Sequence, residues 1–565
     1  MERNRWYKDV VFYQIWPRSF KDGNGDGIGD LWGVLEKLDY IASLDVTGIW
    51  FSPLYPSPQA DYGYDIADYK GIDPAYGDLE VFKRVLDGAH GRGLRVIMDL
   101  VVNHTSSEHP WFRESRSSRD NPYHDYYIWR DGGRDRAGRA TPPNNWDSLF
   151  EGRAWEYEPA IDQWYLHVFA KGQPDLNMDN PRVREEVEDV LRFWLDLGVD
   201  GFREDVITFT SKVPGLPNDH LMPPGARGLR FYENGPRVHE FLAQFRDDVL
   251  SRYDCMTVGE APMITPAKAL PFIEEGPDQT LDLMFHFEHM AADCLFTEYV
   301  PLPFSLRKLK RAFGRWQREL EGRAWNALYI ENHDHPRVVS RYGSEAFRER
   351  SAMMLACSYL FQKGTPFVYQ GQEIGMVNTH FATIDDVPDV AAKNQYRRRI
   401  EAGDSPEKAM ALVNRAARDH ARTPVQWSGG ENAGFSTAEP WFAVNPNYPE
   451  VNVERDEGDP HSVLNFYRRA IRLRRELPVV REGSYHEFKR ASGELYVYAR
   501  EMEGQRLLVL CSFCDHAMSF TVPRGYDLDE GVLELGNYED EGMTEQAEGR
   551  VTFRPYECRV YRFDS

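Results

Sequence analysis

Short apolar runs alternate with segments of helical periodicity along most of the chain. Apolar residues recur three and four positions apart over 31–41 and 79–89, which predicts an amphipathic helix in each segment. Eight apolar runs predict strands, at 10–16, 48–53, 94–102, 199–206, 256–260, 281–287, 327–330 and 366–370. Strand–helix alternation is typical of parallel strands joined by crossover helices. Eight strands of this kind predict an α/β fold, the (β/α)8 TIM barrel.

A long interruption follows the third predicted strand. Residues 104–173 are rich in Trp, Tyr, Arg, Gly and Pro and lack a long helical period. An insertion of this length is more often a small folded module than a loose loop, so we expect an inserted domain B there. The barrel would then comprise residues 1–103 and 174–480.

The pattern changes again toward the end of the chain. A second irregular stretch at about 371–460 precedes a predicted helix over 462–477. After Pro478 the apolar runs are short and rich in β-branched and aromatic residues, as in antiparallel sheets. We therefore expect a C-terminal β-sandwich domain over 485–565.

Charge and composition limit the classes of partner. The chain has 67 basic and 90 acidic residues, a net charge of −23 at pH 7, which disfavours binding to nucleic acid or to anionic membranes. Met1–Val10 lacks the apolar core of a signal peptide, and no apolar run reaches about 18 residues. Six cysteines are too few for a disulfide scaffold. We expect a cytoplasmic protein, monomeric or weakly homo-oligomeric.

Polar residues end the apolar runs of four predicted strands. In order along the chain they are Asp99, Asn103, His104, Arg203, Glu204, Asp205, Glu260, Asn332, His333 and Asp334. A single charged residue at a strand end is usually a loop cap, but here four such ends meet at one mouth of the barrel. Active sites of TIM barrels lie at this mouth, so the pattern favours a catalytic site.

These segments resemble the signature segments of the α-amylase superfamily of retaining glycoside hydrolases. The matching segments are Asp99–His104, Gly201–Val206, Gly259–Glu260 and Asn332–Asp334. Within the superfamily the chain is similar to the oligo-1,6-glucosidase group of exo-acting α-glucosidases, through Gln173–Asn177, Ala421–Trp427 and Val444–Tyr448. The resemblance runs from about Trp6 into the C-terminal domain.

The resemblance implies three catalytic carboxyl groups. Asp205 would be the nucleophile, Glu260 the acid/base, and Asp334 would hold the 2- and 3-hydroxyls of the glucose. Hydrolysis with retention uses two carboxyl groups about 5–5.5 Å apart, one attacking the anomeric carbon and one protonating the leaving oxygen. Strand alternation places Arg203 on the same inward face as Asp205, where a guanidinium favours an ionised carboxylate.

The resemblance also implies a sugar-binding set. Its members are Asp61, Tyr64, His104, Phe150, Phe169, Arg203, His333 and Arg422. Asp61 would bind the terminal glucose and Tyr64 would form its stacking floor. Phe150 and Phe169 fit equally well as core residues of domain B. A site of this group closes behind one sugar, which implies exo-action on a small oligosaccharide.

Residues 22–30 form a separate motif of alternating acidic, Asn and Gly residues. Acidic and amide oxygens can surround one hard cation while glycines permit the tight turns. The motif lacks the glutamate and spacing of an EF-hand, and a Gly-rich turn alone needs no metal. The resemblance implies a structural calcium ion, bound by the side chains of Asp22, Asn24, Asp26 and Asp30 and the Ile28 carbonyl.

We therefore predict a retaining exo-α-glucosidase that acts on short substrates such as isomaltose. In this group a valine after the nucleophile, here Val206, goes with α-1,6 preference, and a smaller or polar residue with α-1,4. Two related activities stay open: α-1,4-glucosidase on maltose, and sucrose isomerase, whose arginine-rich loop is matched here by one arginine in His335-Pro336-Arg337. A non-catalytic amylase-like partner subunit is disfavoured, because the three carboxyl groups are present.

Four positions depart from the pattern of the group. Glu204 replaces an apolar residue, and on alternation it faces the helices, where a bare charge is costly. Met178 stands where Trp is common, and the loop after His289 lacks a lysine that α-1,6-specific relatives often have. Residues 389–392 occupy a place where relatives often carry a glutamate. These departures leave the leaving-group preference open.

Overall fold

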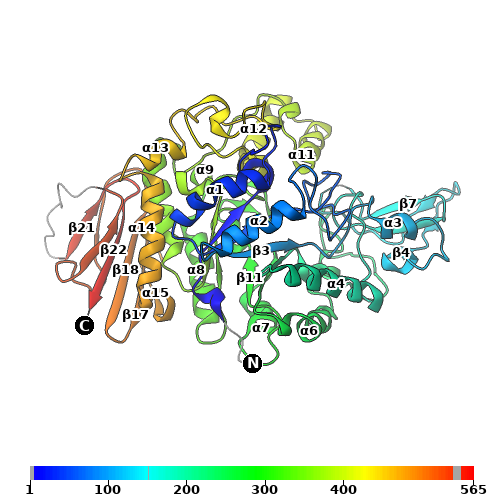
Figure 1. Cartoon of the computed structure of the whole chain (residues 1–565), viewed down its shortest axis with the longest axis horizontal. Helices are drawn as coiled ribbons and strands as arrows, with labels where there is room; N and C mark the ends of the chain where they lie inside the picture. The colour runs from blue at the N-terminus through cyan, green and yellow to red at the C-terminus, as the bar shows by residue number, and fades with distance from the viewer. Residues whose placement is uncertain (1–4, 151, 539–548, 565) are drawn as a thin grey trace.

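The computed structural model describes residues 5–150, 152–538 and 549–564. A barrel of parallel strands lies between an inserted module at one end of the molecule and a β-domain at the other (Figure 1). The spatial order of its strands is β11-β10-β9-β3-β2-β1-β15-β14, and the outermost two, β11 and β14, lie close enough to nearly close the barrel. The predicted TIM barrel with a C-terminal antiparallel β-domain is confirmed.

Each of the eight predicted strands overlaps an observed one. Their bounds are β1 Phe12–Ile15, β2 Gly48–Phe51, β3 Arg95–Leu100, β9 Gly201–Glu204, β10 Met256–Ala261, β11 Leu283–His286, β14 Ala327–Leu328 and β15 Thr365–Tyr369. Almost every residue in them is buried. Strands buried on both faces carry continuous apolar runs, so these strands could be predicted from the sequence.

Helices cover the outside of the barrel and begin at capping residues. The main ones are α1 Leu31–Ser43, α2 Leu79–His90, α4 Pro181–Leu197, α6 Val238–Asp248, α7 Pro266–Ile273, α8 Leu306–Leu320, α10 Arg348–Leu360 and α14 Val463–Glu476. Asp30 and Asp78 accept backbone N–H groups at the starts of α1 and α2. Gly198 ends α4 in the left-handed conformation, φ 108°, that glycine adopts readily.

The interior of the barrel is filled by large side chains. Phe12 stacks on Phe367 with ring centroids 4.9 Å apart, and Trp50 stacks on Phe285 at 5.5 Å. Both pairs belong to one buried apolar cluster that also includes Met256. Because this cluster blocks the barrel, a ligand can be held only at one of its ends.

The inserted module contains a small antiparallel sheet, β4 Trp129–Arg130, β8 Gln163–Leu166 and β7 Trp155–Glu158. A buried lysine, Lys212, connects the segment that follows β8 to the barrel. Lys212 Nζ lies 2.8 Å from Asp175 Oδ2 and 2.9 Å from Asn103 Oδ1, and all three residues are buried. The module is therefore held against the carboxyl end of β3.

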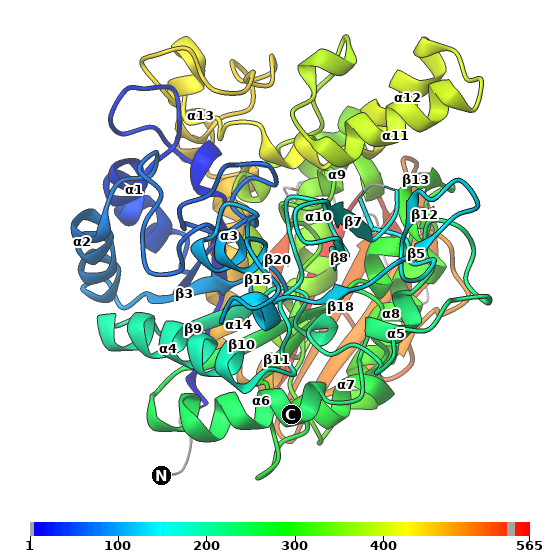
Figure 2. The same cartoon turned by 90° about the vertical axis from the view of Figure 1, so that its right-hand side faces the viewer.

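Besides the five-residue α13 Val453–Glu457, the stretch 371–460, expected to be irregular, contains two longer α-helices. They are α11 Val390–Glu401 and α12 Pro406–Ala416, which stand above the barrel in Figure 2. Few of their residues are buried: Ala392 and Asn394 on α11, and Ala409, Val413 and Ala416 on α12. The expectation was wrong for α11 because the apolar stripe that marks a helix is nearly missing from it, whereas α12 buries only a narrow stripe of three residues.

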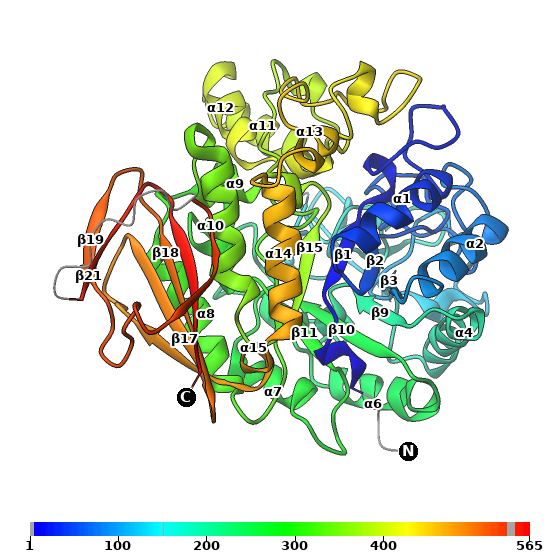
Figure 3. The same ribbon diagram turned by 60° about the vertical axis from the view of Figure 1, so that its left-hand side comes forward.

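The C-terminal β-domain packs against α10 and α14 (Figure 3). Its five-stranded antiparallel sheet has the order β16 Ser484–Phe488, β17 Leu495–Met502, β18 Gln505–Ser512, β22 Cys558–Asp564 and β20 Val532–Gly536, and a second sheet pairs β19 Met518–Thr521 with β21 Arg550–Phe553. Residues 539–548 and 565 of the expected domain, and 1–4 of the barrel segment, lie outside the described residues. Over the described part of the chain, no helix combines the length and the apolar character needed to cross a membrane.

Glu204, the unexplained acidic residue of strand β9, is 3% exposed. Its Oε2 has no hydrogen-bond partner among the described residues. Burial, together with the negative charge of Asp282, raises the pKa of Glu204 to about 8. The side chain is therefore mostly neutral at pH 7, which removes the expected cost of a buried bare charge.

Candidate active site

A cavity of about 330 Å³ lies at the carboxyl ends of the barrel strands. It brings together Asp205, Glu260 and Asp334, and eight of the eleven predicted catalytic and sugar-binding residues line it: Asp61, Tyr64, His104, Phe150, Phe169, Asp205, Glu260 and Asp334. The other three, Arg203, His333 and Arg422, are fully buried and contact the lining residues from behind.

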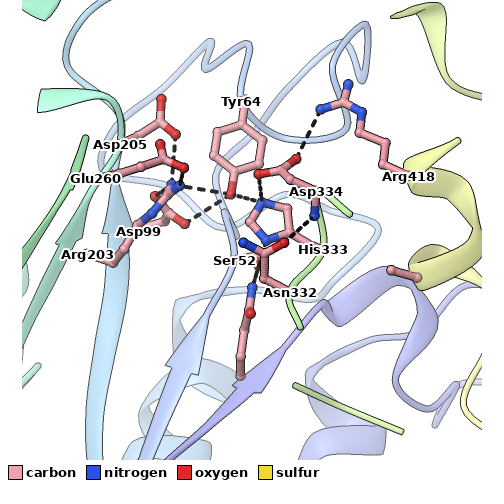
Figure 4. Close-up of polar contacts among 12 residues, drawn as sticks. Ser52, Tyr64, Asp99, Arg203, Asp205, Glu260, Asn332, His333, Asp334 and Arg418 are labelled. Atoms are coloured by element: carbon pink, nitrogen blue, oxygen red, sulfur yellow. Dashed lines mark hydrogen bonds and ion pairs between the residues drawn. The ribbon is translucent and has the colours of Figure 1, made fainter. Parts of the chain in front are cut away.

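Arg203 joins three carboxyl groups at the floor of the cavity (Figure 4). Its Nη1 donates to Asp205 Oδ1 at 2.7 Å and to Asp99 Oδ1 at 2.6 Å, and its Nη2 lies 2.7 Å from Glu260 Oε1. Asp99 and Arg203 are register partners on β3 and β9, and Glu260 lies on β10, the next strand. Three neighbouring strands thus place their carboxyl groups around one guanidinium.

One positive charge cannot balance three negative ones. Burial raises the pKa of Asp99 to about 7, although Arg203 opposes the shift. Burial also raises the pKa of Asp205 well above its ordinary value against the pull of Arg203, and the Glu260 carboxylate adds to the rise. The cluster therefore keeps a proton near neutral pH. A reaction that needs one carboxylate and one carboxylic acid requires this condition.

The residue after Asp205 has an unusual backbone. Val206 has φ 35° and ψ 39°, in the left-handed region, where a β-branched residue is rare and the cost is about 1–3 kcal/mol. Its N–H donates to Glu260 Oε2 at 3.1 Å, and its side chain lines the cavity. The strained backbone therefore orients the carboxyl group of Glu260 beside that of Asp205.

His333 links Tyr64 to Asp334 on the opposite side of the cavity. The amide Nε2 of Gln14 lies 2.7 Å from His333 Nδ1, so Nδ1 accepts and Nε2 carries the ring proton. Nε2 lies 2.6 Å from the Tyr64 hydroxyl and 3.1 Å from Asp334 Oδ2. The Tyr64 and His333 rings are stacked, with an interplanar angle of 4°. Burial lowers the pKa of His333 well below its usual range, so the ring is neutral.

Arg418, which the sequence reasoning missed, closes this side of the cavity. Its guanidinium contacts Asp61 at 2.8 Å, Asp389 at 2.7 Å and Asp334 at 3.1 Å. Arg422 adds a contact of 3.3 Å to Asp334 and donates from Nε to the backbone oxygen of His333. Arg418 lies four positions before Arg422, at helical spacing, and this spacing was the one signal in the sequence that could have revealed it.

The charges around Asp334 keep it ionised. Burial alone would raise its pKa, but the Nε2–H of neutral His333, which points to Oδ2, and the positive charges of Arg418 and Arg422 together hold the pKa well below the usual range. Asp61, in contact with the same Arg418, has its pKa raised to about 6, because burial outweighs the attraction of the arginine. Burial lowers the pKa of His104 to about 4, so this histidine is also neutral at pH 7.

The two phenylalanines from domain B satisfy both interpretations left open. Phe150 and Phe169 line the cavity, with ring centroids 5.3 Å apart in an edge-to-face arrangement. Both also pack in the apolar cluster of the module, together with Trp146 and Phe209. The Arg418 guanidinium lies 5.3 Å from the Phe150 ring centroid. Domain B therefore supplies one wall of the site from its own core.

The predicted calcium loop lies apart from this cavity, and none of its residues lines it. The Asp22 carboxylate accepts backbone N–H groups from Asn24, Gly25 and Gly27, and Asp30 accepts from Gly33 at the start of α1. The described residues contain no group of three or more His, Cys, Asp and Glu side chains arranged for a metal ion. The oxygen donors of the loop nevertheless fit the chemistry of a hard cation.

Comparisons with known proteins agree with this geometry. The family "Alpha amylase, catalytic domain" matches residues 14–483. The chain belongs to the alpha-amylase family of glycoside hydrolases. It is 46% identical to an oligo-1,6-glucosidase of Parageobacillus thermoglucosidasius over 99% of each chain. The resemblance to this group is confirmed.

Two solved structures of other members are superimposable along almost their whole length. The trehalose-6-phosphate hydrolase of Bacillus licheniformis has a TM-score of 0.92 and 42% identity, with 100% of each chain covered. The trehalulose synthase of Pseudomonas mesoacidophila has a TM-score of 0.92 and 39% identity, with 99% of each chain covered. Fold similarity alone therefore does not separate these activities.

We expect Arg418→Met to weaken activity and change its pH dependence. The substitution leaves Asp61, Asp334 and Asp389 without their shared cation, and an unpaired buried charge costs about 3 kcal/mol, which corresponds to about 10²-fold in kcat/KM. The pKa of Asp334 should rise, so the acidic limb of the kcat/KM profile should move to higher pH. The measurement is the pH profile on a nitrophenyl α-glucoside. Arg415→Met, an exposed neighbour on α12, is the matched control, and equal profiles for both variants would contradict the assignment.

Proposed function

We propose that this protein is a retaining exo-α-glucosidase that removes terminal glucose from short oligosaccharides, with α-1,6 linkages preferred. Oligo-1,6-glucosidases that are 43–46% identical over the full chain support an α-glucosidase acting on oligosaccharides. One observation supports the proposal most directly. The carboxyl groups of Asp205 and Glu260 both contact the guanidinium of Arg203, in a cavity that Arg418 also lines. A small oligosaccharide is the expected substrate.

In the first step, Asp205 attacks the anomeric carbon while Glu260 gives its proton to the leaving oxygen. The electron pair of the broken C–O bond stays on that oxygen, and a β-linked glucosyl ester forms on Asp205. In the second step, Glu260 takes a proton from water, which attacks the ester and releases α-glucose. Arg203 and the Val206 N–H keep the two carboxyl groups oriented throughout.

The closed end of the cavity supports exo-action. Asp61 and Asp334, held by Arg418, are carboxylates that can accept hydrogen bonds from the hydroxyls of one glucose, and Tyr64 offers a ring face. Arg418, with the carboxylates it pairs with, forms part of the cavity wall at that end. The substrate chain must therefore extend on the Glu260 side.

Other activities of the family find less support. Arg337, the single arginine of the loop after Asp334, is fully buried against Glu331 at 2.6 Å and does not line the cavity, which speaks against sucrose isomerisation. Arg418 is the only Lys or Arg among the described lining residues, and three carboxylates already engage it. A phosphate group would face Glu298 and Asp389, so trehalose-6-phosphate is disfavoured. α-1,4 action on maltose stays the alternative.

The substrate assignment is tested by kcat/KM on isomaltose, maltose, sucrose and trehalose-6-phosphate under identical conditions. We expect isomaltose to be the best substrate, because Val206 lines the cavity beside the acid/base, and trehalose-6-phosphate to be the poorest. Val206→Ala should lower the ratio of isomaltose to maltose activity. A ratio below one for the wild-type enzyme would replace α-1,6 by α-1,4 preference. Trehalulose as the main product from sucrose would establish the isomerase.

The mechanism predicts different consequences for the two catalytic carboxyl groups. Asp205→Asn should abolish turnover, because an amide is too poor a nucleophile to form the ester. Glu260→Gln should lose about 10²–10⁴-fold on isomaltose but less on nitrophenyl glucosides, whose leaving group needs little protonation.

The product formed with azide tests the stereochemistry of the same mechanism. Azide should restore part of the turnover of Glu260→Ala, since it attacks the ester without a base. It must enter from the α face, so the product should be α-glucosyl azide. Formation of the β-azide, or β-glucose as the first wild-type product, would mean single displacement and would remove Asp205 as nucleophile.

We propose calcium as a structural ion of the 22–30 loop, which would use the side chains of Asp22, Asn24, Asp26 and Asp30 and the Ile28 carbonyl. A chelator should lower Tm, and added calcium should restore it, because an ion that binds only the folded protein stabilises it. Asp26→Ala should remove the chelator effect. Asp68→Ala is the matched control, since Asp68 is also exposed and accepts a backbone N–H two residues on. A Tm that ignores both chelator and calcium would refute the ion.

The cytoplasmic location and the monomeric or weakly associated state also stand as proposals. Light scattering of the purified protein and fractionation of cells test them.

A further inference from the structure

A second cavity, of about 430 Å³, lies at the end of the barrel opposite the active site. The segment before β1, the turn between α1 and β2 and the end of α14 form it (Figure 3). Basic residues outnumber acidic ones in its lining: Lys8, Arg472, Arg474, Arg475 and Arg481 against Asp9, Asp45 and Glu476. Since the whole chain has a net charge of −23, this surplus of two positive charges is a local reversal of sign.

Arg474 is the buried member of this group, with 7% of its surface exposed. Its Nη1 donates to the backbone oxygen of Leu360 and, at 2.7 Å, to that of Gln362, and its Nη2 donates to the backbone oxygen of Gly364. In the part of the chain that the structure describes, no ion pair joins Arg474 to a carboxylate. Carbonyl oxygens satisfy its N–H groups but leave its charge unbalanced, and a buried charge without a counter-charge is costly.

Nearby positive charges raise this cost further. Burial and, after it, the charge of Arg500 lower the pKa of Arg474 to about 9, and Arg481 contributes in the same direction. Arg500 is itself fully buried, donates to the backbone oxygen of Gly483, and has its pKa lowered by burial to about 10. Both buried guanidinium groups are therefore charged at pH 7, and a negative group in the cavity would stabilise them.

The arginines at the rim of this cavity are free to turn toward such a group. Arg472 and Arg475 share one carboxylate, that of Asp45, at 2.7 Å and 3.6 Å, and Arg481 contacts two exposed carboxylates. The side chains of Arg472, Arg475 and Arg481 are 60%, 41% and 42% exposed. Ion pairs at this exposure contribute little to stability, so a ligand can replace them at low cost.

A phosphoryl anion fits these groups better than a small monovalent anion does. A planar guanidinium donates two parallel N–H bonds to the oxygens of one phosphate. A dianion also matches the surplus of two positive charges in the lining. The cavity is larger than the anion alone requires, so the phosphate group of a small ester fits as well as free phosphate.

We propose that this cavity binds a phosphoryl dianion, free or as part of a small ester, as the counter-ion of Arg474. The anion would fasten the end of α14 to the segment between α10 and β15, whose backbone oxygens Arg474 contacts. It would stabilise the fold without taking part in hydrolysis, since the active site lies at the other end of the barrel. The inference does not depend on the proposed function.

The test is a calorimetric titration of the purified protein with inorganic phosphate, with sodium chloride at equal ionic strength as the reference. We expect one saturable site per chain. Above Kd, the Tm should rise with the logarithm of the phosphate concentration, because the anion binds only the folded protein. General stabilisation by phosphate, which acts over the whole surface, would give no saturation in the titration.

Substitutions separate the cavity from the rest of the surface. The double variant Arg472→Gln, Arg481→Gln should raise Kd about tenfold, because it removes charge-assisted hydrogen bonds. Arg469→Gln, which changes an exposed arginine of α14 outside the cavity, is the matched control and should keep the wild-type Kd. Arg474→Met should remove the dependence of Tm on phosphate. If Arg474→Met does not fold, the double variant and its control decide alone.

A parallel titration with glycerol phosphate distinguishes the two sources of the phosphoryl group. Tighter binding than that of inorganic phosphate indicates an ester, and weaker binding indicates the free anion. The inference would be overturned by the absence of saturable binding of either compound, or by the same Kd in the double variant and in Arg469→Gln. Neither result changes the proposed function, because the double variant should hydrolyse a nitrophenyl α-glucoside as fast as the wild type.

Discussion

The geometry of the site depends on one buried guanidinium shared by three carboxyl groups. Arg203 is 2% exposed and contacts Asp99, Asp205 and Glu260, which come from three neighbouring strands. Buried charges of one sign are tolerated only near a counter-charge, so the register of β3, β9 and β10 and the position of Arg203 fix one another. The excess of negative charge keeps a proton in the cluster, as acid catalysis requires.

A second guanidinium, that of Arg418, gathers three more carboxylates in the site. Arg418 holds Asp61, Asp334 and Asp389, and the segments after β10 and β11 add Pro262 and Phe287 to the wall of the same cavity. The carboxylates that Arg418 holds can accept hydrogen bonds from the hydroxyls of one sugar, whereas Pro262 and Phe287 offer only apolar contact. Recognition by hydroxyl groups is therefore expected mainly where Arg418 gathers its carboxylates.

The sequence predicted the barrel better than it predicted the site. All eight strands could be predicted from the sequence because each is a continuous buried apolar run. The helices α11 and α12 were missed because they bury only a few residues each. The three carboxyl groups implied to be catalytic were found through motifs, and the structure brings them into one cavity. Arg418 was missed because its importance comes from residues up to 357 positions away. The backbone strain at Val206 has no signature in residue type, since it exists only after tertiary packing has imposed it.

Strand β9 shows how alternation separates two opposite electrostatic environments. Arg203 and Asp205 share a charged network on one face, while Glu204 between them is buried without that network, and its pKa is raised to about 8. Were Glu204 ionised, it would add a fourth negative charge beside a cluster that already exceeds its cation. Because Glu204 keeps its proton, the fold avoids the cost of a buried charge. The protonation of the cluster of Asp99, Asp205 and Glu260 then depends on these three groups and on Arg203.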